Sequence, residues 1–152
     1  MATYTVESTA DIALTAATAK TILMYICAAN TPAKVVELSV TFDGVTAAAE
    51  PVTVELVSST QATAGTSTSH TMVQVSGATR TAQGTAARNY TAEPTVLTCL
   101  KRWLVHPTAG LVVQFPLGRE PQQNTTADGL GIRCTAPAGV NAQGYLEVAE
   151  EG

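Results

Sequence analysis

The sequence predicts an all-β fold, a single antiparallel β-sandwich of jelly-roll type with about eight strands. Apolar and polar residues alternate in short runs along nearly all of the 152 residues, and Pro, Gly and Asn separate most of these runs. No stretch carries the period of a convincing amphipathic helix. Successive side chains of a strand point to opposite faces of a sheet, so strands with one apolar face are buried by stacking two sheets.

Residues 1–19 are predicted to form an N-terminal arm, and residues 20–152 the jelly-roll domain. The arm contains a short strand candidate around Tyr4 to Val6, followed by a stretch rich in Ala and Thr. Thr21–Ala29 is apolar throughout, which is typical of a strand buried on both faces.

The clearest strand of the chain follows at Val35–Asp43. Polar residues alternate there with four apolar residues of one face: Val36, Leu38, Val40 and Phe42. Val52–Leu56 alternates in the same way after Pro51. Both segments are expected as walls of the sandwich, with one face on the core and the other in solvent.

Residues 58–94 differ in composition from the rest of the chain. They are rich in Ser, Thr, Ala and Gly and contain one strand-like run, Thr71–Val75. A connection of this length is unusual within a compact domain, and its apolar residues are too few to build a second core. We therefore expect a long excursion from the jelly roll and not a second domain.

Four further strands are expected after Pro94: Val96–Val105, Leu111–Leu117, Leu130–Thr135 and Tyr145–Ala149. Eight strands with some long connections fit a jelly roll better than an up-and-down barrel. An immunoglobulin-like sandwich is the alternative. That fold has a Cys, Trp, Cys order, whereas Cys99 and Trp103 lie on one expected strand here.

The sequence contains no recognisable catalytic, cofactor-binding or metal-binding motif. Its two histidines, His70 and His106, are isolated from each other and from clustered carboxylates, whereas metal sites need such clusters. Neither a Gly-x-Ser-x-Gly nucleophile elbow nor a lysine-containing phosphate loop is present. We therefore expect a protein that is not an enzyme and that holds no cofactor or metal.

Charged residues are scarce, at 13% of the chain, and the formal net charge is −4. Nucleic-acid binding requires clustered Lys and Arg. The one adjacent basic pair, Lys101-Arg102, points to opposite faces of a strand, so no nucleic-acid partner is expected. A weakly charged surface lacks the repulsion that keeps neighbouring molecules apart, which favours association.

The cysteines and the N-terminus bear on where the protein is made. Cys27, Cys99 and Cys134 lie in apolar runs without a paired spacing, which is typical of reduced, buried thiols in a cytoplasmically made protein. The first residues lack the basic start and apolar stretch of a signal peptide. No run reaches the ~18 apolar residues that cross a membrane, so no membrane association is expected.

Segments of the second half resemble small jelly-roll proteins that decorate the capsids of tailed bacteriophages. The segments are AEPT at 92–95, the strand around Trp103, FPLGREP at 115–121, GLGIRCTAPAGVN at 129–141 and GYLEVAEE at 144–151. The resemblance implies a capsid decoration (cement) protein or minor structural protein. Such a protein is a homotrimer on the major capsid protein, on the outside of the virion shell, and is made in the host cytoplasm. The resemblance implies no catalytic residue.

Five residues are predicted to lie in interfaces. Arg102 and Trp103 are of types enriched at subunit contacts, and Tyr145 is a further aromatic residue on a strand. Tyr4 and Val6 lie in the arm, which we expect to reach the shell because chain termini order readily against a partner. On this hypothesis, a chain without residues 1–11 stays folded but no longer binds the shell.

The alternative function is a carbohydrate- or receptor-binding module of a virion surface or tail structure. Jelly rolls also serve as lectins, and an exposed Trp103 or Tyr145 can stack on a sugar. Burial of the Trp103 indole argues against that alternative.

Overall fold

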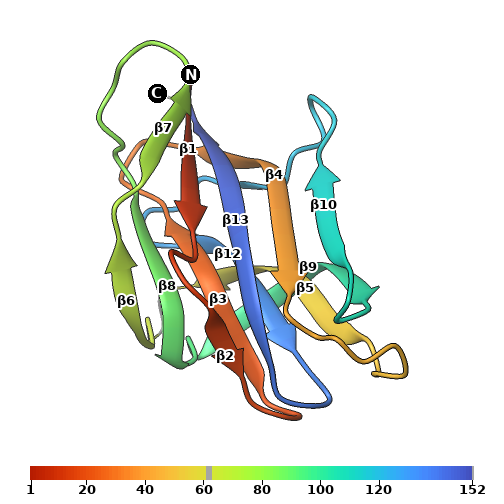
Figure 1. Cartoon of the computed structure of the whole chain (residues 1–152). Coiled ribbons are helices and arrows are strands. Elements are labelled where there is room, and N and C mark those ends of the chain that lie inside the picture. Colours follow the sequence, from red (N-terminus) through yellow and green to blue (C-terminus); the bar gives the residue numbers. More distant parts are fainter. Residues whose placement is uncertain (61–62, 152) are drawn as a thin grey trace.

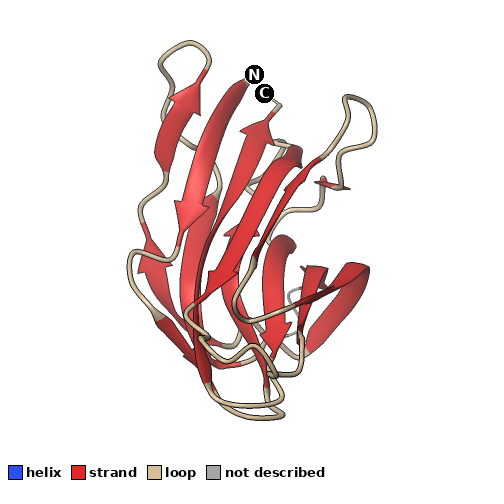
Figure 2. Cartoon of the chain, turned by 45° about the vertical axis from the view of Figure 1, so that its right-hand side comes forward, coloured by secondary structure: helices blue, strands red, loops and turns tan. Residues whose placement is uncertain are grey.

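The structure is a computed structural model that describes residues 1–60 and 63–151, and every regular element in these residues is a β-strand (Figure 1, Figure 2). In chain order the strands are β1 (Ala2–Glu7), β2 (Ile12–Leu14), β3 (Ala19–Ile26), β4 (Ala33–Phe42), β5 (Val52–Thr60), β6 (Thr66–His70), β7 (Val73–Ser76), β8 (Thr85–Ala92), β9 (Val96–Val105), β10 (Gly110–Gln114), β11 (Gln122–Gln123), β12 (Gly129–Thr135) and β13 (Val140–Glu150). The predicted all-β class is confirmed.

The strands form two antiparallel sheets that pack face to face. One sheet has the order β10-β4-β13-β1-β7, with β2 and β11 paired beside this path, and the other has the order β6-β8-β3-β12-β5-β9. Eight of the strands form the four-stranded arrays β10-β4-β13-β1 and β3-β12-β5-β9, and along the chain they change sheet at every step except from β5 to β9. This is the strand order of the predicted jelly roll of about eight strands, and the described chain contains five further strands: β2, β6, β7, β8 and β11.

The excursion at 58–94 is more regular than expected. β5 continues to Thr60, and three further strands follow, of which β7 overlaps the predicted run Thr71–Val75. β8 and β6 extend one sheet beyond β3, while β7 extends the other beyond β1. The excursion therefore adds strands to the same flank of both sheets, which we call the insertion side, seen on the left of Figure 1. Residues 61–62 lie outside the described part.

The expected N-terminal arm is not a separate element. β1 lies between β13 and β7, and β2 pairs with β13. Tyr4 and Val6 are 2% and 0% exposed and belong to the core. The alternation of polar and apolar residues in β1 is that of an ordinary half-buried strand, and burying its apolar face holds it in the sheet. The prediction that these two residues contact a partner is therefore wrong for the folded chain.

Pairing of the first strand with the last brings the two ends of the described chain together. β1 runs antiparallel to β13, and Ala2 lies opposite Glu150. Both termini consequently lie at one end of the sandwich, while the β2–β3 and β12–β13 turns lie at the other end (Figure 1).

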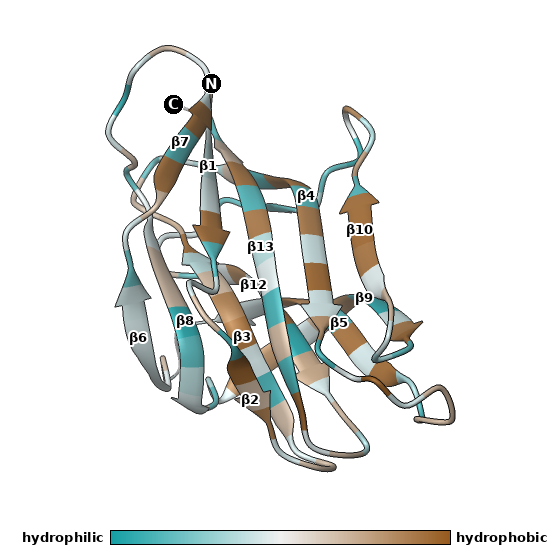
Figure 3. Cartoon of the chain, viewed as in Figure 1, coloured by the Kyte–Doolittle hydropathy of each residue, from teal (hydrophilic) through white to brown (hydrophobic). Residues whose placement is uncertain are grey.

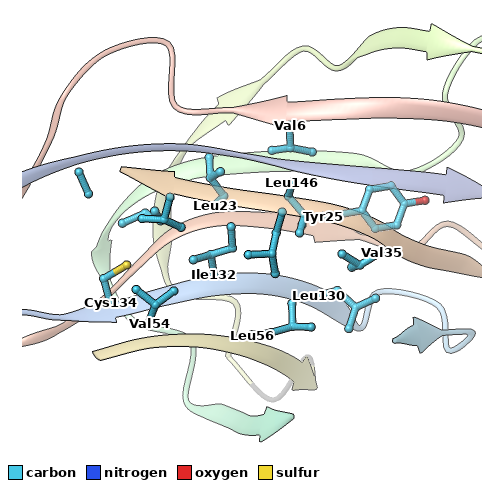
Figure 4. Close-up of a cluster of buried hydrophobic side chains, with 14 of the residues drawn as sticks. Val6, Leu23, Tyr25, Val35, Val54, Leu56, Leu130, Ile132, Cys134 and Leu146 are labelled. Carbon is cyan, nitrogen blue, oxygen red and sulfur yellow. The ribbon is translucent and has the colours of Figure 1, made fainter. Parts of the chain in front are cut away.

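The core fills the space between the sheets (Figure 4). Val6, Val35 and Leu146 of one sheet face Leu23 and Ile132 of the other, and all five are 0% exposed. Burial of one such side chain contributes roughly 1.5–3 kcal/mol. A surface ion pair contributes only about 0–1 kcal/mol. The apolar contacts, and not the few charges, therefore hold the sheets together.

One detail of the clearest predicted strand differs from its sequence pattern. In β4 it is Val35 that is 0% exposed, whereas Val36 is half-buried. The register with β13 shifts here, because Glu37 lies opposite Glu147 but Val35 lies opposite Val148. The shift is a β-bulge at Val36, and a bulge turns the residues on its two sides toward different faces.

A buried carboxylate fastens the loop between β7 and β8 to the core. Glu150 is 0% exposed and accepts hydrogen bonds from the Tyr25 hydroxyl at 2.9 Å and from the N–H groups of Gln83 and Gly84 at 3.0 and 2.8 Å. The Tyr4 hydroxyl donates to the Arg80 carbonyl oxygen at 3.2 Å. Burial and the neighbouring Glu150 raise the pKa of Tyr25 well above its usual range, so Tyr25 stays a donor.

Candidate interaction surface

The flank opposite the insertion side exposes the free edges of both sheets. In the described residues, β9 pairs on one side only, with β5, and β10 pairs on one side only, with β4. β11 pairs with the same edge of β4 as β10, but at the other end of β4. We call this flank the β9–β10 side. In Figure 1 β10 lies at the right, away from β6, β7 and β8.

Apolar side chains are concentrated on the β9–β10 side. Of the nine large apolar residues exposed in the described part of the chain, five lie here: Val96 (41% exposed), Leu100 (42%), Leu104 (70%), Val112 (63%) and Leu117 (91%). Figure 3 colours β10 mainly in the brown of hydrophobic residues, whereas β6 is in pale hydrophilic shades. Monomeric soluble proteins rarely expose contiguous apolar patches beyond a few hundred Å². These exposed side chains make this flank the candidate interaction surface of the described chain.

The core itself reaches the surface at this flank. Trp103, Leu111, Val113 and Phe115 pack against the core cluster but are only half-buried. Lys101 Nζ lies 5.9 Å from the centre of the Phe115 ring, so a strand of one sheet contacts the segment after β10 of the other. At the β9–β10 side, side chains that pack against the core are therefore partly exposed to solvent.

Two of the predicted interface residues lie on the β9–β10 side, on opposite faces of β9. Trp103 is opposite the buried Val54 and points to the core, so it does not present an open ring as a sugar platform would. Arg102 points outward, toward Glu55. The sequence signal, Arg and Trp side by side, therefore points to one strand of this flank but gives no indication of β10, and the prediction that these two residues lie in an interface stays a prediction.

An ion-pair cluster fixes β9 to its neighbours. Glu55 is 4% exposed; it accepts from Arg102 Nε at 2.9 Å and Arg102 Nη2 at 2.5 Å, and from Arg133 Nε at 2.7 Å. Burial alone raises the pKa of Glu55, but the hydrogen bonds and charges of Arg133 and Arg102 outweigh it and hold the pKa below its usual value. The cluster joins β5, β9 and β12 and carries a net positive charge, because one carboxylate is shared by two arginines.

Tyr145 lies elsewhere, on the outer face of the sheet that contains β4 and β13. Its hydroxyl hydrogen-bonds to Glu37, which also accepts from Gln114 Nε2 at 2.5 Å. These bonds lower the pKa of Glu37, and the bond to Glu37 raises the pKa of Tyr145 to about 12. Glu147 lies opposite Glu37, and burial together with that negative charge raises its pKa. The structure thus does not bring Tyr145 together with Arg102 and Trp103.

The groups considered for chemistry at the sequence level are spread over the molecule. His106 lies 2.8 Å from Thr108 Oγ1 and 3.2 Å from the Ala47 carbonyl oxygen, while His70 Nε2 accepts from the Glu7 N–H at 3.4 Å. Among the residues described, no three His, Cys, Asp or Glu side chains gather as metal ligands would. The three cysteines are free.

Two further findings concern the chain as a whole. The described residues include no helix of the length and apolarity that crossing a membrane requires. Comparison with protein-family models, with curated protein sequences and with solved structures finds no match to this chain.

Proposed function

We propose that this protein is a bacteriophage capsid decoration (cement) protein, which binds the major capsid protein on the outside of the shell as a homotrimer and stabilises it. The observation that carries the proposal is the apolar β9–β10 side. A chain that leaves Leu104 and Val112 about two-thirds exposed beside a half-covered core works in contact with other protein surfaces. Its role is structural and not enzymatic, and it needs no cofactor or nucleic acid.

The segments that resemble phage decoration proteins support this function through their positions. FPLGREP runs from the end of β10 to β11, GLGIRCTAPAGVN covers β12 and the start of β13, and GYLEVAEE lies within β13 and just beyond it. These segments are strands and turns of the jelly roll itself, which is the fold that the resemblance implies.

Binding to a shell suits a protein with few charges. Three linked copies that bind three equivalent sites convert weak single contacts into an avidity about 100- to 10,000-fold stronger. Each contact then needs only modest area and no strong charge, which the Ser, Thr and Gln side chains on the outer faces of the sheets allow.

The test is direct binding to shells that lack the protein. Purified chain is mixed with such shells, which are then sedimented and heated. The proposal expects saturable co-sedimentation and a higher temperature of shell disruption, and shells that already carry the protein serve as the control with filled sites. Binding to host glycans without binding to shells would favour the receptor-binding alternative and overturn the proposal.

A further inference from the structure

The insertion side contains a pocket that the proposed function does not use. β6 lies in one sheet, β7 in the other and β8 again in the first, so the chain crosses between the sheets at residues 71–72 and again at residues 77–84 (Figure 1). Residues of both crossings line a pocket of about 400 Å³. The buried Tyr4 of one sheet and Ala86 of the other line it as well, so the pocket extends between the two sheets.

Hydrogen bonds within the chain fix one wall of this pocket, the loop between β7 and β8. The Gln74 side chain binds the loop from within, because its Oε1 accepts from the Arg80 N–H at 3.0 Å and its Nε2 donates to the Ala78 carbonyl oxygen at 2.8 Å. Tyr4 and Glu150 hold the same loop through the bonds described above. A wall fixed in this way loses little conformational entropy when a ligand binds, and such preorganisation favours affinity.

The other crossing places a hydrogen-bond donor at the pocket. His70 lines the pocket at the end of β6, and its Nε2 accepts from the Glu7 N–H at 3.4 Å. A neutral imidazole that accepts at Nε2 carries its proton on Nδ1. The His70 Nδ1–H is therefore a donor.

Hydrogen-bonding groups and apolar surface both contribute to the lining. Arg80 carries five N–H donors, and a guanidinium bonds more than one acceptor at a time. Met72 is half-buried and packs against the core, so it gives the pocket an apolar wall. Hydroxyl groups come from four residues: Ser69, Thr71, Thr81 and Thr85. None of the described residues that line the pocket is Asp or Glu, so the lining favours a ligand rich in oxygen acceptors over a cation.

We propose that this pocket binds a short saccharide. A sugar combines closely spaced hydroxyl oxygens, which suit Arg80, His70 and the threonine hydroxyls, with a C–H face that suits Met72. The volume lies at the lower end of the range of about 300–1,000 Å³ that is usual for small-molecule sites. The inference goes beyond the proposed function, since a protein on the outside of a shell can contact the saccharides of a host surface while it is bound to the shell.

The place of the pocket in the chain gives the excursion at 58–94 a function. The pocket is built mainly from β6, β7, β8 and their connections, which lie outside the two four-stranded arrays of the jelly roll. Connections of such length within a compact domain usually have a function of their own. Binding a ligand is a function that the four-stranded arrays do not need for their own packing.

Methionine methyl NMR on the full chain tests the site directly. The chain contains Met1, Met24 and Met72, of which Met72 lines the pocket and Met24 is buried in a separate cluster with Tyr90. One arm titrates neutral sugars, the methyl glycosides of glucose, galactose and N-acetylglucosamine, and the other titrates glucuronic acid and N-acetylneuraminic acid. We expect at least one saccharide to shift the Met72 signal saturably, with a Kd of about 1 mM or tighter, and to leave the Met24 signal in place.

A pair of arginine variants tests the role of the guanidinium. Arg80→Gln removes it but keeps the backbone N–H and C=O groups that bond to Gln74 and Tyr4. Loss of a charged donor should weaken saccharide binding about 10-fold or more. Arg119→Gln is the matched control, because Arg119 is exposed after β10 and does not line the pocket. Thermal unfolding verifies that both variants fold, and the titration of the unaltered chain does not depend on either.

The outcomes separate this inference from the proposed function. The inference is overturned if no saccharide in either arm shifts the Met72 signal, if inorganic phosphate binds there and saccharides do not, or if a folded Arg80→Gln variant binds as tightly as Arg119→Gln. Co-sedimentation with shells is measured on the same samples. Shell binding without saccharide binding overturns only the saccharide site, whereas saccharide binding without shell binding supports the site and overturns the decoration function.

Discussion

The two flanks of the sandwich differ in how the edge strands of the two sheets are covered. On the insertion side, β6, β7 and β8 extend both sheets. β6 is entirely polar and β7 exposes two valines, while Glu150 and Tyr25 fasten the loop between β7 and β8 to the core. On the β9–β10 side the two sheets end at β9 and β10 without added strands, and five large apolar side chains are exposed. One flank is thus covered by strands of the chain itself, and the other is the flank through which we propose that the protein contacts a partner.

The largest expected effect comes from removing β1, the strand with which β7 of the insertion side pairs. Deletion of residues 1–11 removes β1, to which β7 is paired, and with it the buried Tyr4 and Val6. Since a domain has only about 5–15 kcal/mol of net stability, we expect loss of the folded state. Circular dichroism and the loss of a cooperative thermal transition measure it, with removal of Met1 alone as the control. A truncated chain that stays folded would show that these residues act as an arm.

The next effect weakens the fastening of the insertion side. Glu150→Ala leaves the Tyr25 hydroxyl and two backbone N–H groups without their acceptor in a buried place, and we expect a loss of about 3 kcal/mol in the free energy of unfolding. Glu151→Ala is the matched control on the next residue, whose ion pair with Lys34 is exposed and screened by solvent, so we expect a much smaller loss. Equal losses in chemical denaturation of the two variants would contradict this role of Glu150.

A pH titration distinguishes the β9–β10 side from its opposite. Arg133 and Arg102 hold the pKa of Glu55 below its ordinary value of 4.5, so the cluster stabilises the folded state above pH 4.5 and loses this contribution as the pH falls below it. Arg102 is 61% exposed and its share is screened, so we expect about 1–2 kcal/mol in total.

The measurement is the free energy of unfolding from pH 7 to pH 3. Compared with the unaltered protein, Glu55→Gln should be less stable at pH 7, and the difference should shrink toward pH 3. A difference that is constant with pH would show that the charge of Glu55 does not stabilise β9.

The smallest effect concerns the outer face between the two flanks. Glu147 lies opposite Glu37, and burial and that charge raise its pKa, so its ionised form destabilises the folded state above that pKa. Glu147→Gln should therefore stabilise the protein at pH 7 by about 0.5 kcal/mol, with the gain lost at low pH. Thermal unfolding at pH 7 and pH 4 measures this, and destabilisation at pH 7 would contradict it.

The sequence predicted the strands that alternate and missed those that do not. β4 and β12 were predictable because a period of two is visible in their residues. β6 contains no apolar residue and is held as a strand by its pairing with β8, which a local pattern does not reveal. The bulge at Val36 also escapes the sequence, because it is defined by the register with β13.

The candidate surface was only partly predictable for a similar reason. Arg102 and Trp103 pointed to β9 by residue type alone. The exposure of β10 depends on its place at the end of a sheet, which is set by pairing between distant segments. Tyr4 and Val6 were misplaced because a short strand near a chain end has the same local pattern whether it lies in a sheet or in an arm.

The pairing of Ala2 with Glu150 has a practical consequence for orienting the molecule. Tags fused to the two termini therefore begin next to each other, at the end of the sandwich opposite the β2–β3 and β12–β13 turns (Figure 1). A bulky fusion at either terminus then reports how the protein is oriented on a large particle. If it stays accessible to an antibody, that end of the sandwich faces outward, and if it blocks attachment, that end is the one that touches the particle.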